Sequence, residues 1–266
     1  MKVPFLKGHG THNDFLVLPD LDGSLLGDLD PGLVTSMCDR RAGLGADGVL
    51  RVIRPREEAP WFMDYRNADG SVAEMCGNGV RVYARYLAEA QLIDVTVPLT
   101  VDTRDGLKTV TFCDDGEISV DMGMPVTTDE VTVSVSGRAY AALGVDIGNP
   151  HAVAVVDSLD QLGELGDSPI YCAVAFPRGV NIEFAERRAP QHVAMRVFER
   201  GVGETASCGT GACAVAAVMA RHDDQGVPTS YVVEVAGGRL TVSLDAGHRA
   251  HLKGPAVLVA EGTWRA

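Results

Sequence analysis

An internal repeat is the feature of this sequence that most constrains its fold. The stretch AEMCGNGVRVYARYLAEA (73–90) and the stretch ETASCGTGACAVAAVMA (204–220) each place a cysteine directly before Gly-x-Gly and a helix-like run. Aligning Cys76 with Cys208 sets an offset of 132 residues, about half of the 266-residue chain. Self-similarity at a fixed offset indicates duplicated structural units.

Flanking segments repeat in the same order. GLKTV (106–110) matches GRLTV (238–242), and each begins an alternating apolar pattern typical of a β-hairpin. Upstream matches pair FMDYRNADGSVAEMC with AMRVFERGVGETASC, GHGTHNDFLVL with DIGNPHAVAVV, and AGLGADGVLRV with FPRGVNIEFAE. We therefore predict an α+β fold of two pseudo-symmetric homologous domains. Each is expected to be a mostly antiparallel β-sheet or barrel around a central helix, with a ligand site in the cleft between the domains.

The break between the halves falls near DMGMPVTTDE. We place the first half at residues 1–121 plus 254–266, because the closing GPAVLVAEGTW is expected to return to it, and the second at 122–253. Asp30 and Pro31 are typical of a helix start, which predicts a short helix that runs to Asp39, with a counterpart at 157–165. The run after Cys208 is apolar on nearly every side, so that helix should be buried all round.

Composition excludes several classes of partner. The formal net charge of −13 opposes binding to nucleic acid or to anionic membranes. The longest apolar run has nine residues (212–220), too short to cross a bilayer, and no signal peptide is evident, so we expect a cytoplasmic protein. The sequence contains no C-x-x-C pair, so it does not indicate a zinc site or a thioredoxin-type pair. We interpret Cys38, Cys113, Cys172 and Cys213 as small buried hydrophobic residues.

The positions of the other two cysteines suggest acid/base chemistry. A thiol at a helix start meets unpaired N–H groups and the positive end of the helix dipole, which lower its pKa. The following glycines leave backbone N–H groups free to hold a carboxylate. One copy alone is equally compatible with a buried structural cysteine. Two copies, on opposite faces of a small substrate, suit a racemase or epimerase in which one thiolate removes a proton and the other thiol returns one.

No cofactor is expected. A pyridoxal cofactor would need a lysine for its Schiff base, and none of the four lysines lies in a Gly/Ser-rich phosphate-binding segment. The helix N-termini can instead stabilise a substrate carboxylate as it gains enolate character.

The chain resembles the diaminopimelate epimerase family over essentially its whole length. The resemblance rests on GHGTHNDF, DRRAGLGADG, YRNADGSVAEMCGNG, GNPH, GVNIEF and ERGVGETASCGTGA, in that order. It implies interconversion of LL- and meso-diaminopimelate without pyridoxal, in lysine and peptidoglycan-precursor synthesis. A homodimer is implied by the same analogy.

The resemblance also implies site residues. The two acid/base residues would be Cys76 and Cys208, and His151 and Glu199 would adjust the pKa values of the thiols. The substrate, diaminopimelate, would be bound by Asn13, Asn67, Gly77, Asn78, Asn149, Asn181, Glu199, Arg200, Gly209 and Thr210. No metal site is expected.

Two positions depart from the family pattern, His12 and Gly48, and three alternatives stay open. Gly48 stands where some members carry a polar residue, and it is assigned no role. His12 stands where the family usually has a second glycine, so we expect a change in the loop before Asn13. The first alternative is a proline or hydroxyproline racemase on the same fold, which the set of asparagines opposes. The second is a non-catalytic relative, which the two retained cysteines oppose. A redox sensor would close a Cys76–Cys208 disulfide; we expect that such a bond could form on oxidation and would abolish activity.

Overall fold

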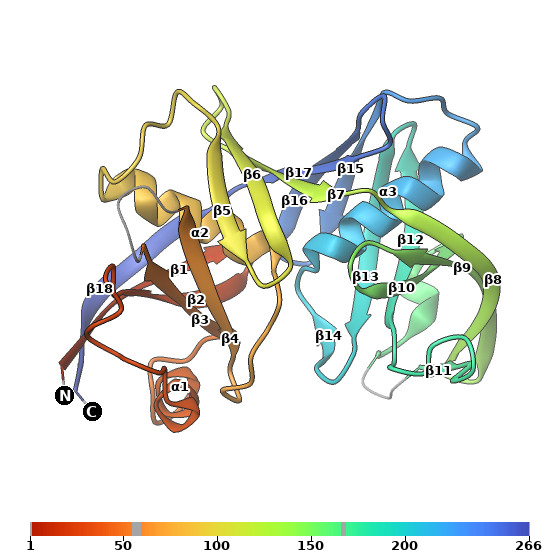
Figure 1. The fold of residues 1–266 in the computed structure, drawn as a ribbon. Helices are drawn as coiled ribbons and strands as arrows, with labels where there is room; N and C mark the ends of the chain where they lie inside the picture. Colours follow the sequence, from red (N-terminus) through yellow and green to blue (C-terminus); the bar gives the residue numbers. More distant parts are fainter. Residues whose placement is uncertain (1, 55–59, 166–168, 266) are drawn as a thin grey trace. The chain divides into compact units, whose positions relative to one another are not determined.

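The computed structural model describes residues 2–54, 60–165 and 169–265 (Figure 1). The chain divides into two compact units, which are described separately here. The first unit comprises Met1–Val120 and Gly254–Ala266, and the second comprises Asp121–Lys253.

Eight strands pair side by side in the first unit. In spatial order they are β18 (Val257–Arg265), β1 (Lys2–Gly10), β2 (Asn13–Pro19), β3 (Gly48–Ile53), β4 (Trp61–Asn67), β5 (Leu99–Thr103), β6 (Gly106–Phe112) and β7 (Ile118–Gly123). The pairs β2–β3 and β4–β5 are parallel, and the others are antiparallel. Helix α1 (Pro31–Cys38) lies between β2 and β3 along the chain, and α2 (Gly77–Glu89) lies between β4 and β5.

The second unit has the same pairing pattern. Its strands in spatial order are β8 (Val126–Val135), β9 (Arg138–Asp146), β10 (Pro150–Val156), β12 (Asn181–Ala189), β13 (His192–Glu199), β15 (Thr229–Val235), β16 (Gly238–Leu244) and β17 (Ala250–Gly254). Again the third and fifth pairs, β10–β12 and β13–β15, are parallel. The short strands β11 (Ile170–Tyr171) and β14 (Gly203–Thr205) pair with β8 and β13. The predicted two-domain, mostly antiparallel α+β fold is confirmed.

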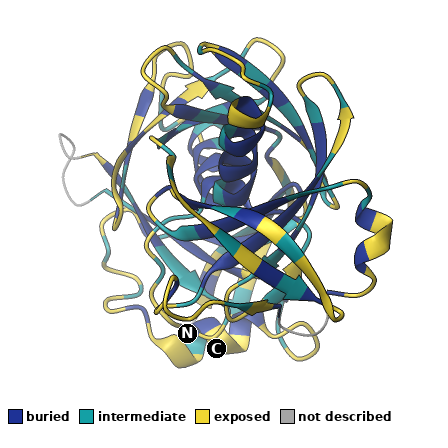
Figure 2. Cartoon of the chain, turned by 90° about the vertical axis from the view of Figure 1, so that its right-hand side faces the viewer, coloured by how far each residue is buried: buried dark blue, intermediate teal, exposed yellow. Residues whose placement is uncertain are grey.

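A helix is enclosed by strands in each unit. Helix α2 packs against β1, β2, β3, β4 and β18, and its Val80, Tyr83 and Leu87 are fully buried. Helix α3 (Gly209–His222) packs against strands β9, β10, β12, β13, β15 and β16. Helix α3, at the centre of Figure 2, is buried over most of its length. The prediction that the helix after Cys208 is buried all round is confirmed. Within the described ranges, no helix has the length and apolar character needed to cross a bilayer.

Of the two shorter helices predicted, the one that starts at Pro31 is confirmed and the one at 157–165 is not. Helix α1 begins as predicted, with the Asp30 carboxylate accepting the Gly32 N–H and Pro31 at the first position, and it ends before Asp39. The predicted counterpart at 157–165 is only a single 3₁₀ turn, η1 (Leu159–Leu162). Gly163 ends that turn with φ 65°, a left-handed conformation that does not continue a helix.

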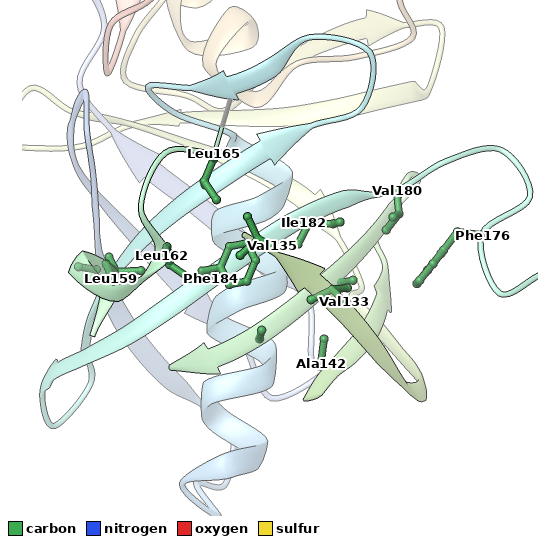
Figure 3. Packing of buried hydrophobic residues seen from close by; sticks show 13 residues of the cluster. Val133, Val135, Ala142, Leu159, Leu162, Leu165, Phe176, Val180, Ile182 and Phe184 are labelled. Carbon is green, nitrogen blue, oxygen red and sulfur yellow. The ribbon is translucent and has the colours of Figure 1, made fainter. Parts of the chain in front are cut away.

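The core of the second unit orients strand β12. Ile182 and Phe184 pack in a cluster with Val133, Val135 and the η1 leucines on one face of the strand (Figure 3). Side chains alternate along a strand, so Asn181 and Glu183 point to the opposite face. That face meets the first turn of α3, where a Cβ on Gly211 would lie 2.6 Å from Glu183 Oε1. The apolar cluster therefore aims Glu183 at the start of α3.

The interpretation of the four remaining cysteines needs correction. Cys38 and Cys213 are buried, as expected. Cys113 is half-buried and Cys172 is exposed, because Cys172 directly follows the short strand β11 and is not part of the core. None of the six cysteines, all of which lie in the described residues, forms a disulfide.

The β1–β2 turn shows how His12 is accommodated. Gly10 pairs with Asn13, and the two residues between them, Thr11 and His12, have φ angles of 49° and 64°. Positive φ at both central positions is the type I′ hairpin turn, which matches the twist of the strands. His12 is exposed, and its ring contacts His9 edge-on at 5.6 Å between centroids. The backbone of the turn is therefore left-handed at position 12 although this residue is a histidine and not a glycine.

Replacing His12 by glycine should relieve this strain. We expect His12→Gly to raise the free energy of unfolding by about 0.5–1 kcal/mol, because the left-handed penalty of a Cβ exceeds the entropy cost of glycine. Urea unfolding measures the change. His12→Ala is the control, since it removes the ring and keeps the Cβ. A larger loss of stability in His12→Gly than in His12→Ala would contradict the turn assignment.

Candidate active site

Both repeated cysteines are N-cap residues of enclosed helices. Cys76 precedes α2 in an extended conformation (φ −145°), and its Sγ accepts the Gly79 N–H at 3.4 Å. Cys208 precedes α3 in the same conformation (φ −122°). The predicted position of each thiol at a helix start is confirmed. The glycines Gly77 and Gly209 open the two helices, where N–H groups lack partners within the helix.

In the first unit, Asn13 lies beside Cys76. The Asn13 Oδ1 accepts hydrogen bonds from the Cys76 thiol (3.5 Å) and from Asn78 Nδ2 (3.2 Å). Its Nδ2 donates to Asp47 Oδ2 at 2.7 Å, and Asp47 is also held by Arg40. The amide of Asn13 is therefore fixed at both ends, with its oxygen toward the thiol.

Asn78 is oriented by a buried cation. The side chain of Asn78 is fully buried, and its Oδ1 accepts from Arg81 Nη2 at 2.9 Å. Arg81 is itself fully buried and also donates to the carbonyl of Gly77 (3.4 Å). Its position one turn into α2 places a positive charge beneath the Cys-Gly-Asn-Gly turn.

Asn67 does not join this group of hydrogen bonds. It ends strand β4, and its Nδ2 donates to Ser71 Oγ at 3.0 Å. That bond closes the turn that leads from β4 toward Cys76.

In the second unit, Cys208 lies beside a buried carboxyl group. Glu199 accepts hydrogen bonds from the Cys208 thiol and from Thr205 Oγ1, the latter at 2.5 Å. Burial raises the pKa of Glu199. Burial also raises the pKa of Cys208 well above its usual value, and the charges of Glu199 and Glu183 raise it further. The predicted lowering of the thiol pKa at this helix start is therefore wrong for Cys208, because burial and the two acids outweigh the helix N-terminus, and the sulfur carries its proton at neutral pH.

His151 reaches Cys208 through two other side chains. Its Nε2 lies 2.9 Å from Asn149 Oδ1, and Asn149 Nδ2 donates to Thr210 Oγ1 at 3.3 Å. Thr210 Oγ1 is 3.5 Å from the Cys208 sulfur. On its other side, His151 Nδ1 lies 2.7 Å from Glu183 Oε1. The structure thus brings together Asn149, His151, Thr210 and Cys208.

Asn181 and Arg200 form a separate contact at the end of β13. Asn181 Oδ1 accepts the backbone N–H of Arg200 at 2.9 Å, and Arg200 Nη1 donates to the carbonyl of Arg178 at 2.8 Å. Arg200 is exposed, whereas the neighbouring Glu199 points toward Cys208. Among the ion pairs of the described residues, none joins Glu199 to Arg200.

Four residues of these networks were missed at the level of sequence: Asp47, Arg81, Glu183 and Thr205. Glu183 had the clearest signal, since it is a charged residue within the otherwise apolar IEFA of a strand, where charge is rarely buried without a partner. Arg81 lies on the apolar face of a buried helix, which is a similar signal. Asp47 and Thr205 lie in loop and edge segments, and their roles depend on distant residues.

The raised pKa of Cys208 predicts slow alkylation. Iodoacetamide reacts with thiolate, so modification of Cys208 should be slow at neutral pH and rise only at alkaline pH. Glu199→Gln removes one of the charges that oppose ionisation, which lowers the pKa of Cys208, and should speed the reaction several-fold at a given pH. Peptide mass spectrometry measures the rate.

Glu204→Gln is the matched control for this experiment. Glu204 lies on β14 and pairs with Arg196 at 2.7 Å. Equal alkylation of Cys208 in the Glu199→Gln and Glu204→Gln proteins would contradict the effect of Glu199 on the thiol.

No group of three or more His, Cys, Asp or Glu side chains within the described residues is arranged to hold a metal ion. Carboxylate binding is the better fit at the two helix N-termini, because glycine N–H groups and a thiol lie together there.

Comparison with known proteins identifies the family of this chain. The family model of diaminopimelate epimerase matches residues 5–128 and 143–259. A diaminopimelate epimerase of Streptomyces coelicolor is 51% identical, over 98% of this chain and 95% of its own length. One from Thermobifida fusca is 46% identical over 98% and 97%.

Two solved structures share the fold at low sequence identity. A phenazine biosynthesis protein of the PhzF family from Bacillus anthracis has a TM-score of 0.79 at 18% identity, covering 100% of both chains. A hydroxyproline epimerase from Agrobacterium vitis has a TM-score of 0.70 at 16% identity, covering 98% of this chain and 92% of its own. From the family match and the two close relatives, we conclude that this chain belongs to the diaminopimelate epimerase family of isomerases.

Proposed function

We propose that this protein interconverts LL- and meso-diaminopimelate by a two-base mechanism without a cofactor. The observation that carries the proposal is the pair of thiols, Cys76 and Cys208, at the N-termini of equivalent buried helices in two units with the same strand order. The curated relatives named above are diaminopimelate epimerases. Their similarity supports the choice of substrate.

The proposed reaction exchanges one proton on each face of the α-carbon. The thiolate of one cysteine removes the α-proton and becomes a thiol, leaving the substrate as an enolate-like carbanion. The thiol of the other cysteine donates its proton from the opposite face and becomes a thiolate. The stereocentre is inverted, and the enzyme is left in the protonation state that catalyses the reverse reaction.

The start of each helix supplies the electrostatic support that this step needs. The α-proton of an amino acid is a weak acid, so the charge that develops on the carboxylate must be stabilised. Backbone N–H groups at Gly77-Asn78 and at Gly209-Thr210, together with the positive helix ends, are suited to hold it. Donors held in place by folding need no reorganisation during the reaction.

The surroundings of the two thiols support different starting roles. Burial and the carboxylates of Glu199 and Glu183 keep Cys208 protonated, so Cys208 starts as the acid. Cys76 is the other thiol and starts as the base once it has lost the proton that it donates to Asn13 Oδ1 in this structure. In the reverse direction the Cys208 thiolate takes the α-proton, and the thiol that re-forms donates a hydrogen bond to Glu199. His151 lies 2.7 Å from Glu183, whose charge also acts on Cys208.

The remaining family residues would recognise the distal end of the substrate. Amide side chains of Asn67, Asn149 and Asn181 offer donors and acceptors, and Glu199 and Arg200 offer opposite charges. A cyclic amino acid such as proline has no distal ammonium group, so this set favours diaminopimelate. Working in the cytoplasm as a homodimer, the enzyme would supply meso-diaminopimelate for lysine and peptidoglycan precursors; light scattering on the purified protein measures its mass.

Solvent-exchange NMR tests the reaction. In D₂O under reducing conditions without added cofactor, the protein should incorporate deuterium at the α-carbon of LL-diaminopimelate and produce the meso isomer. Exchange with proline and none with diaminopimelate would overturn the proposal.

Removal of one thiol tests the two-base mechanism. Cys208→Ala should abolish epimerisation, because one face of the α-carbon then lacks an acid/base group. Cys213→Ala is the matched control, since Cys213 is a buried cysteine on the same helix. It should retain activity, and full activity in the Cys208→Ala protein would eliminate the mechanism.

A further inference from the structure

Glu183 is a buried acid to which the steps above assign only an effect on the protonation of Cys208. Its side chain is fully buried on the face of β12 that meets α3, and Oε1 lies 2.7 Å from the equally buried His151 Nδ1. The second oxygen, Oε2, is buried with no hydrogen-bond partner among the described residues. A buried ion pair adds little to net stability, and an unsatisfied carboxylate oxygen costs free energy. Stability alone therefore does not account for an acid at this position.

The contacts of His151 define its charge. Asn149 Nδ2 donates to Thr210, so the Asn149 Oδ1 faces His151 Nε2 as an acceptor at 2.9 Å. A carboxylate oxygen of Glu183 faces the other ring nitrogen. Two acceptors require a donor at both nitrogens, and histidine has two N–H donors only as the imidazolium ion.

We propose that Glu183 is a positioning residue that holds His151 as an imidazolium and thereby sets the direction of the hydrogen bonds that end at Cys208. From His151 Nε2 each donor points toward the thiol: His151 to Asn149, Asn149 to Thr210, and Thr210 Oγ1 to Sγ. A hydroxyl that donates to sulfur stabilises the thiolate, which is the form in which Cys208 acts as a base. The acceptor on its other side, Glu199, suits the thiol form.

The charges around this chain explain why a cation is needed. The titratable groups that face the His151–Glu183 pair are Cys208 before α3 and Glu199 on β13, and both interact electrostatically with Glu183. Without His151 as a cation, formation of the thiolate would place further negative charge beside two acids in a buried site. The positive charge of the imidazolium offsets the negative charge of one of the two acids. It also keeps each hydrogen-bond donor of the chain directed toward the Cys208 sulfur.

Histidine ¹⁵N NMR tests the charge state without turnover. His151 resonances, assigned by their absence in a His151→Asn protein, should show both ring nitrogens protonated at pH 8 in the wild-type enzyme. A neutral His151 with one bare ring nitrogen would overturn the proposal. This measurement also does not depend on the folding of any Glu183 variant.

Substitution of Glu183 tests the positioning role. Glu183→Gln keeps the size of the side chain and removes the charge, so His151 should become neutral and have one proton for two acceptors. One hydrogen bond of the chain is then lost or reversed. We expect kcat to fall by about 10- to 100-fold, the range for removal of a partner that orients an active-site group, with KM nearly unchanged and a folded protein.

Glu186→Gln is the matched control. Glu186 lies on the same strand, where its carboxylate accepts the Leu159 N–H at 2.9 Å and pairs with Arg188, so kcat should stay at the wild-type value. Wild-type kcat in Glu183→Gln would overturn the positioning role.

The kinetic test rests on the proposed epimerase function, and the NMR test does not. An imidazolium spectrum in a protein without epimerase activity would therefore locate the failure in the proposed function.

Discussion

A helix N-terminus enclosed by β-strands is the constraint on which the rest of this structure depends. An α-helix leaves its first N–H groups without internal partners, and burial makes such groups costly unless something binds them. Each unit has a cysteine as the N-cap residue and glycines in the first turn, and a side-chain capping hydrogen bond is recorded at Cys76 but not at Cys208. The sulfur of Cys76 accepts the Gly79 N–H directly. The N–H groups that are costly to bury are also the groups that can bind a carboxylate. The feature that the fold must stabilise therefore lies where the proposed chemistry occurs.

Equivalent scaffolds surround the two thiols with different chemistry. Both units order their strands alike, with parallel pairs at the same two places. Around Cys76 the neighbours are amides, backed by the buried guanidinium of Arg81. Cys208 contacts Thr210 and Glu199, and the charge of the buried Glu183, which holds His151, also acts on it. A reaction that needs one protonated and one deprotonated thiol is compatible with this difference.

Much of the fold could be predicted from the sequence, because its signals lie within short segments or occur in both halves of the chain. The Cys76 and Cys208 repeats identified both enclosed helices and the duplicated α+β plan, and Asp30 with Pro31 identified the start of α1. The helix expected at 157–165 was wrong, because Gly163 ends the segment after a single 3₁₀ turn. His12 was expected to alter its loop, yet a type I′ turn tolerates it because both central residues are already left-handed. Asn67 and Arg200 were grouped with the site by analogy, and their contacts here lie in neighbouring turns.

The sequence by itself determined which groups are available: two thiols at helix starts, a repeated architecture and a set of asparagines. The tertiary structure decided which of these groups touch and in which sense their hydrogen bonds run. Glu183 meets His151 because β12 and β10 are parallel neighbours, which places Val153 opposite Glu183 and His151 opposite Asn181 on one face. Asp47 reaches Asn13 across 34 positions of the chain. Such contacts depend on strand register and packing between distant segments, and a linear pattern does not encode either one locally.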